Sequence, residues 1–168
     1  MNLIKQPNRA SCLATAFAMC MGVDVEHVFK ILGHDGTEIA FTNLEVPRCY
    51  RGFHSAELIW LANSRGFTVM ELPKSLDISH DMKDIKSFKP FYSVKMYFEH
   101  HDIVLTNGHH AIAWDWRSKS IYDPMGKIYT DLAIDYLYND FDIFYIFGSK
   151  CQTSLELFDL HINGMHEH

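Results

Sequence analysis

The chain has 168 residues, of which 48% are hydrophobic and 14% aromatic, so it can form one domain with a sizeable core. Disordered, collagen-like and low-complexity chains have other compositions and are excluded. The 15 basic and 21 acidic residues give a formal charge of −6, and no run of Lys or Arg occurs, which argues against nucleic-acid binding. We expect a single domain over residues 1–168, with residues 150–168 as a peripheral tail.

Three helices are predicted in the first half of the chain, over residues 12–21, 25–32 and 55–65. The first two follow Ser11 and Asp24, whose side chains are typical N-caps. A glycine ends each helix, and the apolar residues of the second and third recur at helical spacing. The pattern therefore predicts a helical layer with one apolar face per helix.

The second half changes to short β-branched and aromatic runs separated by turn residues. Strands are expected over residues 67–72, 91–98, 103–106, 110–116, 121–123 and 141–147, with a hairpin turn over 117–120 and a short helix over 131–138. Helices followed by an antiparallel sheet predict an α+β fold, in which an N-terminal helical layer packs on a C-terminal sheet.

Residues 10–23 also have the outline of a secretory signal peptide, because they are uncharged and follow Lys5 and Arg9. The run is shorter than the roughly 20 residues that span a bilayer. Its Ser, Thr and Cys residues make it a weak signal segment. We interpret it as a core helix and expect no membrane span.

The four cysteines, Cys12, Cys20, Cys49 and Cys151, form no Cys-x-x-Cys pair, which disfavours a zinc knuckle or a redox dithiol. Free thiols in a reducing, cytoplasmic compartment are expected. Cys20, Cys49 and Cys151 are interpreted as buried or incidental thiols.

The 11 histidines are the compositional oddity. Two groups have metal-binding residue types: His100 and His101 with Asp102, and His161 with His166 and His168. Neither group has a zinc-site spacing such as His-Glu-x-x-His, so we expect no metal and no other cofactor.

Cys12 lies in the first turn of the first predicted helix, where unpaired backbone N–H groups and the positive end of the helix dipole stabilise a thiolate. A cysteine in an Ala-rich helix is usually a small core residue. Gln6 favours the other interpretation, because its side-chain amide can donate to a developing oxyanion together with the backbone N–H of Cys12. These two residues predict a nucleophile with an oxyanion hole.

Two adjacent histidines begin a predicted strand, which sends their side chains to opposite faces. We choose His110, which alternation groups with Ile112 and Trp114, as the catalytic base, and expect His109 to face solvent. Asp123 ends the next antiparallel strand, about 4.8 Å away. It is expected to accept a hydrogen bond from His110 Nδ1 and to fix the tautomer of the ring. Taken singly, a strand-end histidine and an Asp before Pro have ordinary structural roles.

The segment over residues 33–37, Gly-His-Asp-Gly-Thr, joins two helical segments. We expect a solvated turn there, with a border of the substrate cleft as the alternative. Trp114 and Trp116 either flank the catalytic face or pack the sheet.

The order of these elements resembles the papain-like cysteine peptidases, and most closely their small C39-like (bacteriocin-processing) branch. The matching residues are Gln6, Cys12, the His-Ala-Ile-Ala run from His110, and Asp123 before Pro124. The resemblance covers roughly residues 1–148. It implies Gln6 as oxyanion donor, Cys12 as nucleophile, His110 as general base and acid, and Asp123 as the residue that orients it. It also implies a cleft between a helical layer and an antiparallel sheet.

The expected function is that of a thiol hydrolase that cleaves a peptide or isopeptide bond in a protein or peptide substrate through a thioester. An acyltransferase or transglutaminase-like enzyme would use the same residues. A catalytically inactive papain-like module that binds a partner protein is the alternative from another class. Leu13 favours this alternative, because the C39-like peptidases usually have glycine after the nucleophile.

Overall fold

The computed structural model describes residues 1–39, 50–74, 94–130, 137 and 140–148, and only the backbone of residues 94–96. The expected helix over residues 131–138 lies outside this part except at the buried Leu137. Cys49, Cys151, the tail and its histidines also lie outside it.

The described helices have nearly the predicted bounds: α1 is Cys12–Met21, α2 is Val25–Leu32 and α3 is Ser55–Ser64. The Asp24 side chain caps α2 by accepting from the Glu26 N–H at 3.4 Å. Gly22 ends α1 with a φ of 66°, a left-handed conformation that glycine adopts without steric cost. The tight turn at Gly22 lets the chain reverse from α1 into α2.

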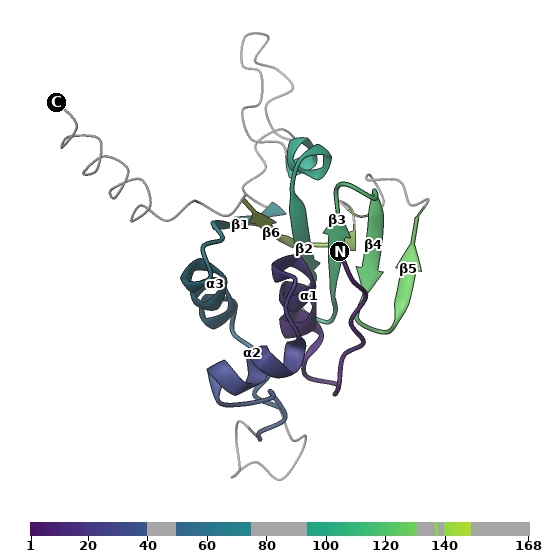
Figure 1. Ribbon diagram of the computed structural model, residues 1–168. Coiled ribbons are helices and arrows are strands. Elements are labelled where there is room, and N and C mark those ends of the chain that lie inside the picture. The colour runs from purple at the N-terminus through teal and green to yellow at the C-terminus, as the bar shows by residue number, and fades with distance from the viewer. Residues whose placement is uncertain (40–49, 75–93, 131–136, 138–139, 149–168) are drawn as a thin grey trace, which may run out of the picture.

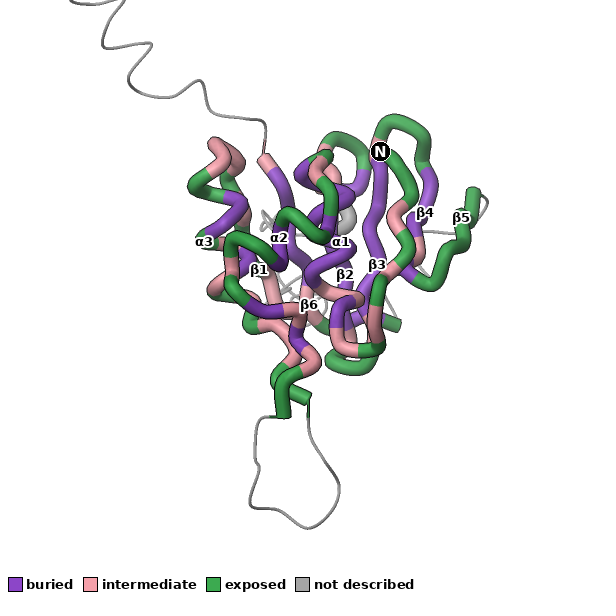
Figure 2. Tube along the Cα trace, turned by 60° about the horizontal axis from the view of Figure 1, so that its bottom comes forward, coloured by how far each residue is buried: buried purple, intermediate pink, exposed green. Residues whose placement is uncertain are grey.

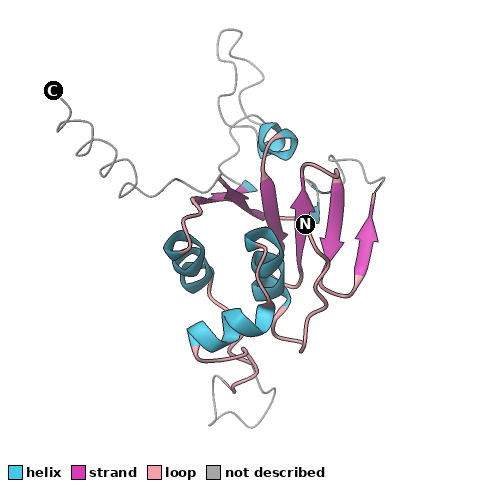
Figure 3. Cartoon of the chain, in the orientation of Figure 1, coloured by secondary structure: helices cyan, strands magenta, loops and turns pink. Residues whose placement is uncertain are grey.

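The described strands form one six-stranded sheet in which every neighbouring pair is antiparallel. They are β1 (Val69–Pro73), β2 (Asp102–Thr106), β3 (Ala111–Asp115), β4 (Ser120–Asp123), β5 (Lys127–Tyr129) and β6 (Ile143–Phe147). Their order across the sheet is β1-β6-β2-β3-β4-β5. The helices α1, α2 and α3 lie on one side of this sheet, with α1 in front of β2 and β3 (Figures 1 and 3). The predicted α+β architecture is therefore confirmed.

The strand prediction was wrong at two places. The expected strand over residues 91–98 falls partly outside the described residues, and Val94–Glu99 is a 3₁₀ helix, η3. This helix buries Phe98, whose ring meets Trp114 edge-on at 5.5 Å, and the Phe98 carbonyl accepts from Trp114 Nε1 at 2.9 Å. β5 was missed because all three of its residues are exposed, so no apolar alternation marks it.

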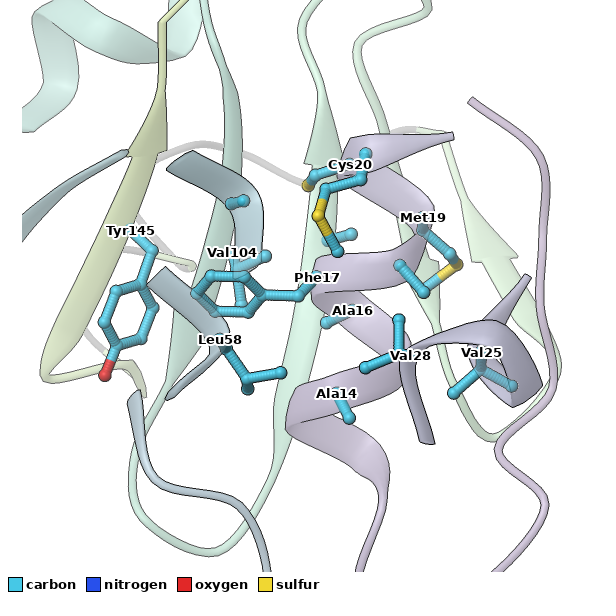
Figure 4. Close-up of a cluster of buried hydrophobic side chains, with 14 of the residues drawn as sticks. Ala14, Ala16, Phe17, Met19, Cys20, Val25, Val28, Leu58, Val104 and Tyr145 are labelled. Carbon is cyan, nitrogen blue, oxygen red and sulfur yellow. The ribbon is translucent and has the colours of Figure 1, made fainter. Parts of the chain in front are cut away.

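The core lies between α1 and the middle of the sheet, with a second cluster on the opposite face. Figure 2 shows α1 and the central strands largely buried and β5 exposed. Phe17 points from α1 toward Tyr145 (Figure 4), at 5.1 Å between ring centroids, and lies 5.3 Å from Phe147. Ala111 and Ala113 of β3 have no exposed surface and belong to the same cluster. Their small side chains let α1 approach the strand closely.

By length and composition, no single helix in the described ranges could cross a membrane. α1 and α2 pass that test only as a pair, and they are bent by 111° at the break between them.

Candidate active site

Three segments that are distant in sequence meet at one end of the molecule. Cys12 is the first residue of α1, His110 directly precedes β3, and Asp123 is the last residue of β4. α1 packs along β3, and β3 pairs with β4 in antiparallel register. The start of the helix, the start of β3 and the end of β4 therefore lie together (Figure 1).

His110 and Asp123 form a direct hydrogen-bonded pair. His110 Nε2 lies 2.9 Å from Asp123 Oδ1, and the two side chains are 33% and 13% exposed. The backbone N–H of Met125 also donates to Asp123 Oδ1, at 2.8 Å, so the carboxylate is held by its own turn. The prediction that Asp123 would contact Nδ1 was wrong. Nε2 is the ring atom farther from the His110 backbone, and it is the one that reaches the neighbouring strand.

The Cys12 side chain also acts on the His110 ring. The pKa of His110 is raised above its ordinary value, and a hydrogen bond with the Cys12 side chain is the largest cause. Burial lowers this pKa, while the charge of Asp123 and its hydrogen bond raise it. Because Nε2 contacts Asp123, Nδ1 is the ring nitrogen that could exchange a proton with a thiol. A thiol, an imidazole and a carboxylate are the groups that an activated thiol needs.

A tight turn holds the His110 backbone in place. Asn107 Oδ1 accepts from the N–H groups of His109 and His110, at 3.1 and 3.0 Å, and Thr106 Oγ1 donates to the His110 carbonyl at 3.0 Å. Gly108 has a φ of 81°, which this turn requires. His109 is exposed, as expected.

Strand alternation does not place the His110 side chain, because His110 lies outside β3. Ala111 and Ala113 face α1, while Ile112 and Trp114 belong to the cluster on the other face of the sheet. Trp114 therefore packs the sheet and does not flank the site.

Ser11 occupies the N-cap position of α1, but its side chain does not cap the helix. Its fully buried hydroxyl donates to the Asn8 carbonyl at 3.0 Å and accepts from the Asn8 N–H at 3.4 Å. The predicted hydroxyl cap was wrong, because the preceding turn engages the Ser11 oxygen. Among the described residues, the N–H groups of Cys12 and Leu13 have no acceptor. They remain available to an anion at the start of α1.

Gln6 lies beside the end of β4. Its backbone N–H donates to the Pro124 carbonyl at 2.8 Å, which fastens the N-terminal segment next to Asp123. Its side-chain Oε1 is buried and has no hydrogen-bond partner within the described part of the chain. The carboxamide is therefore not committed to a structural bond through this atom.

Asn8, which the sequence analysis did not single out, organises the segment between Gln6 and Cys12. Its Oδ1 accepts from the Ala10 N–H at 2.9 Å, and its Nδ2 donates to the Asp35 carbonyl at 3.0 Å. The first bond is an Asx-type turn, for which an Asn two residues before the bonded N–H is a recognisable signal. The second bond crosses to a distant segment and had no signal in the sequence.

That distant segment, residues 33–37, is not the solvated turn that we expected. His34 is only 6% exposed, stacks on Phe53 at 4.7 Å, and places Nε2 3.2 Å from Glu57 Oε2. At Gly36 a Cβ atom would lie 2.7 Å from the Phe53 ring and 3.3 Å from the Ala10 carbonyl oxygen. His34 and Gly36 are therefore buried against the turn that precedes Cys12, while Gly33 is exposed.

The two described cysteines are both free, but their surroundings differ. Cys12 is partly exposed, whereas Cys20 is 7% exposed at the other end of α1. The pKa of the Cys20 thiol is raised by burial and, to a smaller extent, by Asp102 and Asp115. Of the two thiols, Cys12 is the more accessible. Within the described ranges, no group of three or more His, Cys, Asp or Glu side chains is arranged to hold a metal ion.

No protein-family model matches the chain, and no curated protein matches it in sequence.

Proposed function

We propose that the protein is a papain-like thiol hydrolase that cleaves a peptide or isopeptide bond in a protein or peptide substrate. The observation that carries the proposal is the 2.9 Å contact between His110 Nε2 and the Asp123 carboxylate, on a ring whose pKa is raised chiefly by the Cys12 side chain. A ring fixed on one side by a carboxylate can exchange a proton with a thiol on its other side. A site that depends on a free thiol suits a reducing, cytoplasmic compartment.

The reaction begins when His110 takes the Cys12 proton and the thiolate attacks the carbonyl carbon of the substrate. The Cys12 backbone N–H and the Gln6 amide stabilise the oxyanion of the tetrahedral intermediate. The C–N bond breaks, His110 returns the proton to the departing amine, and a thioester on Cys12 remains. Water, deprotonated by His110, then attacks the thioester, which releases a carboxylic acid and restores the thiol. Asp123 orients the ring throughout and stabilises its protonated form.

Leu13 is compatible with this proposal. Its side chain is partly buried and packs against the core cluster beneath α1, so part of it faces the interior of the protein. This reduces the weight of Leu13 as an argument for an inactive binding module.

The proposal is tested by the reaction of the protein with p-nitrophenyl acetate and with iodoacetamide near neutral pH, in a Cys49→Ser/Cys151→Ser background. We expect an acetyl adduct on Cys12, a burst of p-nitrophenol, and alkylation of Cys12 well ahead of the buried Cys20. Cys12→Ala should abolish the burst, and Cys20→Ala is the matched control that should leave it unchanged.

Preferential labelling of Cys20 with an inert Cys12 would overturn the proposal. Retention of the burst in Cys12→Ala would do the same. If the acetyl group passes to added glycine methyl ester faster than to water, the enzyme is an acyltransferase that uses the same residues.

A further inference from the structure

The turn between β2 and β3 replaces one bond of their ladder. The last paired residues of these strands are Thr106 and Ala111, so the next pair in register is Asn107 with His110. The Asn107 backbone N–H donates to the His110 carbonyl at 3.3 Å, as in a regular antiparallel pair. The reciprocal bond is different, because the His110 N–H donates to the side-chain Oδ1 of Asn107 at 3.0 Å. A side-chain oxygen therefore stands where the ladder would use a main-chain oxygen.

This replacement bears on the direction of the His110 ring. A continued ladder would group His110 with Ile112 and Trp114, which pack on the face of the sheet opposite α1. The contacts of the ring lie elsewhere: its Nε2 is 2.9 Å from Asp123 Oδ1, and a hydrogen bond with Cys12 of α1 is the largest cause of its raised pKa. The turn, and not the alternation of β3, therefore sets where the ring points.

The Asn107 carboxamide is itself held at both ends. Its Oδ1 also accepts from the His109 N–H at 3.1 Å, and its Nδ2 donates to the Asp140 carbonyl at 3.3 Å. Thr106 Oγ1 adds a bond to the His110 carbonyl at 3.0 Å. Asparagine suits this position because one side chain supplies both an acceptor and a donor. The turn is thereby fixed to β2 on one side and to the segment that precedes β6 on the other.

We propose that Asn107 is a positioning residue, whose carboxamide replaces one ladder bond and so directs the His110 imidazole toward Asp123 and Cys12. The inference rests on the proposed thiol hydrolase, in which His110 is the general base, and it gives Asn107 no contact with the substrate. A displacement of about 1 Å in a reacting group can cost roughly 100-fold in rate. Loss of this side chain should therefore impair the activation of Cys12.

Asn107→Ala removes the acceptor and the donor, and the main-chain carbonyl of residue 107 is then free to continue the ladder. The pKa of His110, followed through the imidazole C–H resonances, should fall, because the ring leaves the two groups that raise it. Alkylation of Cys12 by iodoacetamide, in the Cys49→Ser/Cys151→Ser background, should slow roughly tenfold or more near neutral pH. At about pH 10 a cysteine thiol ionises without a base, so the rate should stay within about twofold of the wild type.

Asn107→Ser keeps a neutral acceptor that forms the same kind of turn more weakly, so it should recover part of both values. Asn63→Ala is the matched control, because Asn63 is exposed on α3, and it should change neither. An unchanged His110 pKa in Asn107→Ala would overturn the inference. Equal slowing of alkylation at both pH values, or no recovery in Asn107→Ser, would also overturn it.

A measurement on the wild type keeps the inference testable if Asn107→Ala does not fold. The His110 N–H lies outside β3 but is hydrogen-bonded, so it should exchange with solvent at least about tenfold more slowly than the N–H of the exposed Arg9. Equal exchange rates would overturn the inference.

The His110 pKa and the exchange rate are measured without substrate, which separates this inference from the proposed function. A wild type that gives no burst with p-nitrophenyl acetate would reject the hydrolase, while a lowered His110 pKa in Asn107→Ala would still show that Asn107 directs the ring. A burst in the wild type with an unchanged His110 pKa in Asn107→Ala would reject the role of Asn107 alone.

Discussion

The backbone N–H of Gln6 donates to the carbonyl of Pro124 at 2.8 Å, which places the N-terminal segment against the residue that follows Asp123. Through this bond, the amide proposed as oxyanion donor and the carboxylate proposed to orient His110 occupy the same end of the sheet. The bond uses only backbone atoms, so the Gln6 side chain can be changed without removing it. The catalytic role of the Gln6 side chain can therefore be tested without loss of the backbone bond to Pro124.

Gln6→Ala should slow acetylation of Cys12 by p-nitrophenyl acetate by about 10²–10³-fold, the usual cost of losing one oxyanion donor. Alkylation by iodoacetamide forms no tetrahedral oxyanion, so its rate should stay within about twofold of the wild type. The two rates are measured in parallel by stopped-flow absorbance and mass spectrometry. Equal slowing of both reactions would show that Gln6 supports the fold around Cys12 instead.

Asp123→Asn should lower the pKa of His110, because the variant removes a charge and a charge-assisted hydrogen bond that raise it. The rate of acetylation should fall by roughly 100-fold as the ring loses its orientation. The His110 pKa is followed through the imidazole C–H resonances, and the rate over the same pH range. Asp140→Asn, at an exposed position, is the control that should change neither value.

Cys12→Ala should also lower the pKa of His110, since hydrogen bonding to Cys12 is the largest cause of its elevation. A raised folded-state pKa contributes stability that is fully present below the unfolded value of about 6.5. This contribution is lost as the pH rises through the raised pKa. The free energy of unfolding of the wild type should therefore fall more steeply above pH ~6.5 than that of Cys12→Ala. Parallel pH profiles from urea titrations would contradict the contact between Cys12 and His110.

Asn8→Ala should reduce both stability and Cys12 reactivity, because it removes the bonds to Ala10 and Asp35 that shape the turn before α1. The expected loss in the free energy of unfolding is about 1–3 kcal/mol. Asn8→Asp keeps the acceptor for the Ala10 N–H and loses the donor to Asp35, so it should retain part of the stability. A fully reactive Cys12 in Asn8→Ala would show that the turn does not depend on this side chain.

Ala113→Leu should destabilise the protein by about 1–3 kcal/mol, because Ala113 has no exposed surface where β3 faces α1. Added volume there separates the helix from the strand, and it should slow the reaction of Cys12 with p-nitrophenyl acetate as well. Urea denaturation measures the first effect and the acetylation rate the second. Met125→Leu, at a position 59% exposed, is the control expected to have no effect on stability.

The local elements followed from the sequence because their signals are local. Each of these signals involves only a few neighbouring residues: the glycine after α1, the Asp24 cap of α2, and the short apolar runs of β2 and β3. The four elements form where expected. η3 and β5 escaped prediction because packing alone distinguishes them: η3 buries Phe98 under the sheet, and β5 pairs with β4 without burying a face.

The candidate site residues could be proposed from the sequence, since a thiol at a helix start, a histidine at the start of a strand and an aspartate at the end of the next strand are compatible with one chemistry. Only the tertiary structure decided which ring nitrogen of His110 meets Asp123, and that the Ser11 hydroxyl turns to Asn8 and leaves the start of α1 uncapped. It also decided that His34 and Gly36 are buried against the turn before Cys12. These features depend on contacts between segments far apart in the chain. Their geometry is set by how closely α1 packs on β3, which no local pattern encodes.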